Sequence, residues 1–225
     1  MSNSKMVSYT RLSPNNSGKR TMKIDRITPH CVVGQCSVET LGRIFSDKKR
    51  RASSNYGIGS DGRVGMYVPE NKRSWCSSSA KNDQRAVTIE CASDTKEPYT
   101  MNDKVYKQLV KLCIDICKRN GKNKLLWLGD KKKTLAYSPK PNEMVLTVHR
   151  WFANKSCPGN WLYSRLGSLA ATVTKELSGT GEPDKNLYRV QVGTFQDKRN
   201  AEDCLARIKK DGFPDAFITV VEDYK

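Results

Sequence analysis

Short apolar runs alternate with amphipathic stretches along most of this 225-residue chain, and this alternation restricts the fold class. Three apolar runs are typical of buried strands: residues 87–91, 125–128 and 145–148. Residues 106–117 and 162–177 instead repeat their apolar side chains at helical spacing. Strands that alternate with helices predict an α/β domain with a mixed central β-sheet flanked by helices.

Two segments nearer the N-terminus carry different signals. Residues 56–59 and 64–68 flank Asp61 and Gly62, a pair that accepts the positive φ of a tight turn. They predict a β-hairpin. Residues 1–23 are polar and basic, so we expect a tail or an extended arm there.

The composition changes at residues 178–184, where small and helix-breaking residues gather. We therefore expect a main domain over residues 1–178, a linker over 179–186 and a small β-α-β module over 187–225. The module would consist of three elements: a strand at 188–193, a helix at 200–210 and a strand at 216–221. A module of about 39 residues is close to the size below which domains need outside help to stay folded.

The chain is strongly basic, with 40 Lys and Arg against 23 Asp and Glu and a formal charge of +17. Such a charge favours polyanions: nucleic acid, an anionic membrane surface or an anionic cell wall. The basic runs at residues 48–51 and 131–133 have no interleaved aromatic residues, which argues against stacking on single-stranded nucleic acid. No apolar run approaches the roughly 20 residues of a membrane span.

The cysteines and the first residues indicate the compartment. The chain starts without the apolar core of a secretory signal, so we expect synthesis as a cytoplasmic protein that leaves by a separate route. Its eight cysteines are then expected to be reduced thiols. Cys113 and Cys117 lie one helical turn apart and are predicted to be small core residues.

Only two histidines occur in the chain, and both lie near predicted strand ends. His30 ends the run at residues 27–30, and His149 ends the apolar run at 144–149, eight residues before Cys157. Taken singly, each of the three side chains is more typical of a structural role. Together, two imidazoles and one thiolate would hold a zinc ion with a fourth position open, as in a catalytic site.

Four segments resemble one family. Residues 147–151 (TVHRW) and 155–159 (KSCPG) resemble the zinc motif of N-acetylmuramoyl-L-alanine amidases of the peptidoglycan-recognition type. Residues 54–64 resemble the hairpin of that family, and residues 87–90 resemble its central strand, which ends in an acid. The resemblance extends over about residues 24 to 178. Without a signal segment, it indicates a phage or prophage endolysin that lyses its host.

The resemblance implies a role for each matching residue. His30, His149 and Cys157 would bind one Zn²⁺, which polarises the amide between N-acetylmuramic acid and L-alanine in bacterial peptidoglycan. Glu90 would be the general base, and Lys155 would stabilise the oxyanion. A solvent-facing strand residue is the alternative for Glu90. A peptidoglycan-binding protein of the same fold without activity is the alternative for the whole domain, although the retained Cys157 argues against it.

The chain departs from the family at two positions. Relatives often carry a tyrosine eight residues before the hairpin glycine, where this chain has Ser54. Tyr56 would point to the same face of a strand and could make the transition-state contact in its place, although sheet packing is its alternative role. Relatives also often have Trp-His where this chain has Trp75 and Cys76. We expect Cys76 to line the cleft without being a metal ligand.

The C-terminal segment resembles one repeat of the sporulation-related (SPOR) domain, on residues 188–195, 200–202 and 212–217. The resemblance implies binding to peptidoglycan glycan strands. A lone repeat leaves a sheet edge open, so we expect two chains to pair through residues 187–225. The alternative is that this segment is a small appendage packed on the main domain. Anionic wall polymers fit the positive charge. A basic nucleic-acid-binding protein is the remaining alternative, but we expect neither nucleic acid nor membrane as a partner.

Overall fold

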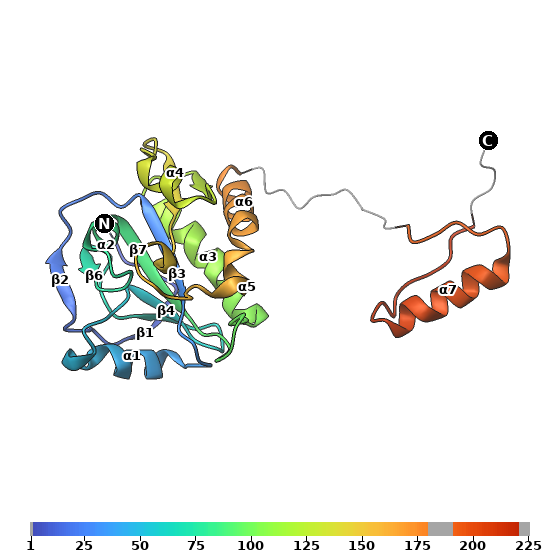
Figure 1. The fold of residues 1–225 in the computed structure, drawn as a ribbon, viewed down its shortest axis with the longest axis horizontal. Coiled ribbons are helices and arrows are strands. Elements are labelled where there is room, and N and C mark those ends of the chain that lie inside the picture. Colours follow the sequence, from blue (N-terminus) through green and yellow to red (C-terminus); the bar gives the residue numbers. More distant parts are fainter. Residues whose placement is uncertain (1, 180–190, 221–225) are drawn as a thin grey trace. The chain divides into compact units, whose positions relative to one another are not determined.

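The structure is a computed structural model that describes residues 2–179 and 191–220. The chain divides into two compact units, residues 1–182 and residues 183–225 (Figure 1). Within the described ranges, no helix combines the length and the apolar character that a membrane crossing requires.

The first unit is built on a seven-stranded sheet. Its strands lie in the order β1 (Val7–Thr10), β5 (Val64–Met66), β4 (Tyr56–Ile58), β7 (Ala86–Cys91), β3 (Arg26–Cys31), β9 (Glu143–Leu146) and β8 (Lys124–Leu126). All neighbouring strands are parallel except β4 and β5, which form the predicted antiparallel hairpin around Gly62, with a φ of +87°. Two short strands, β2 (Asn16–Lys19) and β6 (Lys72–Ser74), pair separately. The predicted mixed α/β class is confirmed.

Helices cover both faces of this sheet. The helical elements of the first unit are α1 (Val38–Ser46), η1 (Lys48–Arg50), α2 (Ala80–Arg85), α3 (Asp103–Arg119), α4 (Lys131–Ala136), η2 (His149–Trp151), α5 (Gly159–Tyr163) and α6 (Leu166–Leu177). The stretch at 162–177, predicted as one helix, is thus divided between α5 and α6. The predicted helix at 106–117 is α3, which begins at its cap Asn102, whose side chain accepts from the N–H of Val105.

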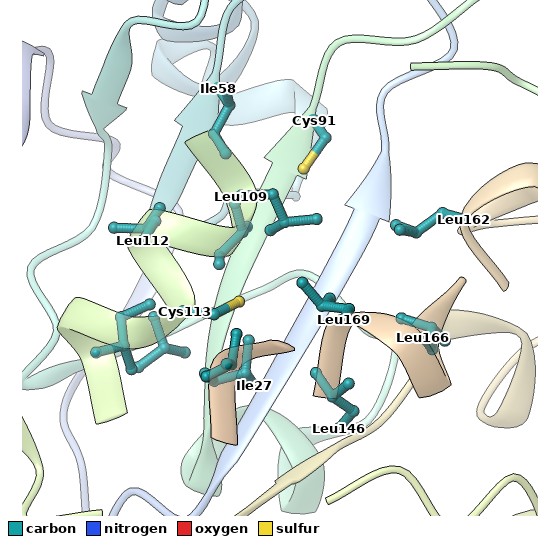
Figure 2. Packing of buried hydrophobic residues seen from close by; sticks show 14 of the residues in the cluster. Ile27, Ile58, Cys91, Leu109, Leu112, Cys113, Leu146, Leu162, Leu166 and Leu169 are labelled. Carbon is teal, nitrogen blue, oxygen red and sulfur yellow. The ribbon is translucent and has the colours of Figure 1, made fainter. Parts of the chain in front are cut away.

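The main core lies between the sheet and the pair α3 and α6. Figure 2 shows Leu109 and Cys113 of α3 and Leu169 of α6 gathered over Ile27 of β3. These four side chains are fully buried, and each large one stabilises the fold by about 1.5–3 kcal/mol. Cys113 and Cys117 are confirmed as core residues.

The opposite face of the sheet is partly apolar and partly polar. Leu41, Phe45 and Tyr67 form a small second cluster under α1. Beyond it, buried hydroxyls bond to one another, as between Thr28 and Thr147 at 2.7 Å. These polar residues leave the ends of β3 and β7 uncovered by an apolar helix, and the candidate site lies there.

The prediction of an extended arm over residues 1–23 is wrong. This segment forms β1 and β2, and Ser4, Ser13 and Asn15 are buried. The side-chain amide of Asn15 donates to the carbonyls of Phe45, Asp47 and Ala52, at 2.8–3.3 Å. Val7 and Tyr9 of β1 pack against the two core clusters, whereas residues 13–19 carry no apolar periodicity and are held by hydrogen bonds to backbone.

The second unit contains the predicted helix as α7 (Lys198–Lys210), but its flanking strands differ from expectation. Residues 191–193 and 216–220 form no strand, whereas residues 188–190 and 221 lie outside the described residues. Most of the predicted linker, 180–186, also lies outside them. Four large apolar side chains of this unit are 66–83% exposed: Val192, Phe213, Phe217 and Val220.

Candidate metal centre and active site

The predicted site residues meet at the carboxyl edge of the sheet. His30 of β3 and Glu90 of β7 are register partners on neighbouring parallel strands, so their side chains leave the same face. His149 follows the end of β9, the other neighbour of β3. A cleft of about 970 Å³ opens there, and His30, Glu90, His149, Lys155 and Cys157 all line it.

Three side chains predicted as metal ligands converge in this cleft. One ligand atom each from His30, His149 and Cys157 lie within 4.8 Å of one another. The Sγ of Cys157 is 3.2 Å from Nδ1 of His30, and the two imidazole ring centres are 5.1 Å apart. The structure therefore brings His30 together with two residues that lie more than 100 positions away in the sequence.

The loop that carries Cys157 is fastened to η2 by Arg150. The N–H of Arg150 donates to the carbonyl of Cys157 at 3.1 Å, and its guanidinium donates to the carbonyl of Ser156. The guanidinium also contacts the Asn160 side chain and the face of the Tyr163 ring. Arg150 thereby fixes the thiol relative to the neighbouring His149.

A hydrogen bond with the Ser78 hydroxyl and a stacked tryptophan in the same short helix fix the position of His149. Its Nε2 lies 2.9 Å from the hydroxyl of Ser78, which leaves Nδ1 for a ligand. Two residues further on, Trp151 stacks on Trp127 with ring centres 5.1 Å apart and planes 5° from parallel. A hydrogen bond on the second ring nitrogen is the usual way in which proteins orient a metal-binding histidine.

The ionisation of the three groups fits cation binding. Burial, and then the neighbouring His149, hold the pKa of His30 well below 6.5. Burial and then the charge of Lys155 lower the pKa of His149 as well. Both imidazoles are thus neutral, the form that binds metals. Nε2 of His30 is buried without a hydrogen-bond partner, and burial raises the pKa of the Cys157 thiol, which a bound cation would reverse.

Glu90 is the acid of the cleft. Its side chain is 16% exposed, and Oε1 lies 3.9 Å from Nδ1 of His30. Oε2 is buried without a hydrogen-bond partner. Burial raises the pKa of Glu90 to about 8.

The other cleft walls are basic. Lys155 is exposed and lies close enough to His149 to lower its pKa. Arg50, Arg51 and Arg73 also line the cleft. Asp83, the remaining acid in the lining, is occupied by hydrogen bonds from the N–H groups of Cys76 and Ser77 and from the hydroxyl of Ser77. The cleft is therefore suited to an anionic ligand.

The prediction of a transition-state contact from Tyr56 or Ser54 is wrong, because neither side chain lines the cleft. Tyr56 is the register partner of Ile89 and shares its core-facing side of the sheet, opposite Glu90. Its hydroxyl donates to Glu70 at 2.7 Å and accepts from the N–H of Ser4. The Ser54 hydroxyl donates to the Tyr56 carbonyl. Sheet packing, the alternative role, is what the structure shows for Tyr56.

Sequence reasoning missed several contacts in the cleft. Ser78, which bonds His149, adopts a φ of +59°, and nothing in its sequence context announces this. Cys76 lines the cleft as expected, and its Sγ lies 3.7 Å from Oε1 of Glu90. Arg50 and Arg51 of the basic run at residues 48–51 also border the cleft, which the sequence did not indicate.

Comparison with known structures supports the fold. The crystal structure of a selenomethionine derivative of AmpD aligns with a TM-score of 0.53 and 20% identity, over 75% of this chain and 96% of that one. PGRP-SA of Apis mellifera aligns with a TM-score of 0.50 and 13% identity, over 70% and 93%. These likenesses show the fold alone. No curated protein sequence matches the chain.

Two family models match the sequence. One, described as the SPOR domain, matches residues 161–219, although α6 at the start of this match is buried in the first unit through Leu166, Leu169 and Val173. The other, described as N-acetylmuramoyl-L-alanine amidase, matches residues 20–160 and thus more than half of the chain, including all three candidate ligands and Glu90. The protein therefore belongs to the N-acetylmuramoyl-L-alanine amidase family.

Proposed function

We propose that the protein is a zinc-dependent amidase that hydrolyses the bond between N-acetylmuramic acid and L-alanine in bacterial peptidoglycan. The observation that carries the proposal is the convergence of His30, His149 and Cys157 within 4.8 Å in a cleft that also holds Glu90. Two imidazoles and a thiolate suit zinc, and three protein ligands leave a position for water or substrate, which structural zinc sites do not.

The residues of the cleft divide the reaction among them. When bound, zinc supplies a Lewis acid for the carbonyl and lowers the pKa of the attacking water. Glu90 takes the proton from that water and returns it to the nitrogen of the leaving L-alanine. Lys155, an exposed cation beside His149, stabilises the negative charge that develops on the carbonyl oxygen.

The basic wall of the cleft supports peptidoglycan as the substrate. Stem peptides carry free carboxylates, and Arg50, Arg51 and Arg73 face the cleft in which such a peptide would lie. Nε of Arg73 is buried without a hydrogen-bond partner. Guanidinium groups pair with carboxylates through two parallel hydrogen bonds, so these side chains would orient the peptide.

Hydrolysis of purified cell walls tests the proposal. We expect free alanine amino groups to appear without new reducing sugar, and a chelator or Cys157→Ala to abolish their release. Reducing sugar without amines would overturn the proposed bond specificity. Wall binding without either product would instead indicate a peptidoglycan-binding protein without activity.

We further propose that the second unit holds the enzyme on the wall as a SPOR-type module. The match of the SPOR model supports this role, and the exposed Phe213, Phe217 and Val220 support pairing of two chains to complete the sheet. Sedimentation at micromolar concentration should show a dimer for the full chain and a monomer for residues 1–182. A monomeric full chain would exclude the pairing.

For its biological role we propose an endolysin that is made in the cytoplasm and reaches the wall by a separate route. The basic charge fits a target rich in anionic wall polymers. Expression in a bacterium whose walls the protein digests should cause lysis only after the membrane is permeabilised. Lysis without permeabilisation would contradict the need for a separate route.

A further inference from the structure

A second group of ligand-type side chains lies beside the first. One ligand atom each from His30, Cys76 and Glu90 lie within 4.8 Å of one another. Oε1 of Glu90 is 3.7 Å from Sγ of Cys76 and 3.9 Å from Nδ1 of His30. Imidazole, thiolate and carboxylate together form a donor set that zinc and related cations accept.

These groups are held in place and have bonding capacity left over. The N–H of Cys76 donates to Oδ2 of Asp83 at 3.0 Å, and the next residue, Ser77, donates to the same carboxylate. Oε2 of Glu90 is buried without a hydrogen-bond partner. A buried polar atom without a partner is costly, and a bound cation would remove that cost.

We propose that Cys76 and Glu90, beside His30, form a second cation position through which excess zinc inhibits the enzyme. The inference rests on the proposed function, since inhibition arises because the second ion occupies the carboxylate of the general base. On binding, the Cys76 thiol releases its proton to solvent and its sulfur donates an electron pair to the ion. This assignment replaces the expectation that Cys76 is no ligand.

The two positions adjoin at His30. Its Nδ1 faces Cys157 at 3.2 Å and Glu90 at 3.9 Å, and one ring nitrogen binds one ion. With the first ion on that nitrogen, Cys76 and Glu90 hold the second ion, which removes the base and leaves the first ion in place. The state with only the first position filled is the active one.

Titration of wall hydrolysis with zinc tests the inhibition. For each protein, the activity in excess zinc is divided by the maximum activity of that same protein. When free zinc reaches ten times its dissociation constant for the second position, the ratio should fall about tenfold, because only the unoccupied fraction remains active. Cys76→Ser and Cys76→Ala should keep the ratio near one. Cys36→Ser, which changes another thiol of the cleft, should be inhibited like the natural protein. Equal inhibition of the Cys76 variants would overturn the proposal.

Cobalt absorption provides a readout that needs no activity. Co²⁺ bound to a thiolate absorbs in the near ultraviolet by charge transfer from sulfur. The Cys157→Ser variant should retain such a band through Cys76, and the Cys76→Ser/Cys157→Ser double variant should lose it. A Cys157→Ser variant without the band, in a protein whose natural form cleaves the amide, would remove the second position and leave the proposed function intact. If the natural protein does not cleave the amide, but Cys157→Ser keeps the band and the double variant loses it, the second position stands and the proposed function falls.

Discussion

Glu90 and His30 lie opposite each other on β7 and β3, so sheet register alone sets the distance between the proposed base and a proposed ligand. We expect Glu90→Gln to lower kcat for amide hydrolysis by roughly 10²–10⁴-fold, because the amide keeps the shape of the carboxyl but accepts no proton. Zinc content, measured by atomic emission, should stay at one ion per chain. By comparison, Cys157→Ser should lose activity, and full activity of Glu90→Gln would refute its role.

A buried ion pair on the far side of β4 is expected to matter for stability rather than for activity. Glu70, 1% exposed, accepts from both terminal nitrogens of Arg119 at 2.5 and 2.9 Å and from the hydroxyl of Tyr56. Glu70→Ala leaves Arg119 with Asp115 as its remaining carboxylate and the Tyr56 hydroxyl without its acceptor, and we expect a loss of about 1–3 kcal/mol in the free energy of unfolding. Urea denaturation measures it.

The exposed pair of Glu39 with Arg63 is the matched control for this change. Water screens that pair, so Glu39→Ala should leave the urea midpoint almost unchanged. Similar losses of unfolding free energy for Glu70→Ala and Glu39→Ala would show that burial does not strengthen the pair of Glu70 with Arg119.

At the scale of elements, the approach of α1 to the sheet depends on a residue without a side chain. A Cβ added to Gly57 of β4 would lie 2.7 Å from Cδ1 of Leu41 and 2.7 Å from Cε2 of Tyr67. Gly57→Ala must displace α1 or that ring, and we expect a cost of about 1–3 kcal/mol by thermal unfolding.

Gly167 in α6 offers the comparison, since its nearest neighbour would be 3.7 Å away. Gly167→Ala should cost nothing and should stabilise the helix by roughly 0.5–1 kcal/mol. If Gly57→Ala and Gly167→Ala shift the thermal unfolding alike, close packing of α1 does not make Gly57 necessary.

Elements with apolar periodicity were predictable from sequence, and elements without it were not. The strands β7 and β9 and the helix α3 follow from their buried residues, and parallel strand ends explain why His30 and His149 meet. β1 and β2 rely on contacts such as Asn15 with Asp47, more than 30 residues away, which no local pattern encodes. Tyr56 lies outside the cleft because its position on β4 turns its side chain toward the core.

At the scale of the whole molecule, the boundary of the first unit can be tested against the family match that begins at residue 161. Leu166, Leu169 and Val173 of α6 are fully buried against the core. Leaving three such cavities costs about 2–5 kcal/mol each, comparable to the total stability of a domain. We therefore expect residues 1–182 to fold and residues 1–160 to fail, as judged by circular dichroism and a cooperative melt.

Retention on purified walls should fall when the second unit is removed. A cooperative melt of residues 1–160 would instead place α6 outside the catalytic unit.

The stack of Trp127 on Trp151 gives the protein an optical property of its own. Two nearly parallel indoles with ring centres 5.1 Å apart couple their electronic transitions, and a coupled pair in a chiral setting produces a paired positive and negative ellipticity band. Trp151 lies in the same turn of helix as His149, so any adjustment of that histidine is transmitted to the coupled pair. Cation uptake can therefore be followed in the unlabelled chain by its exciton signal, with no substrate present.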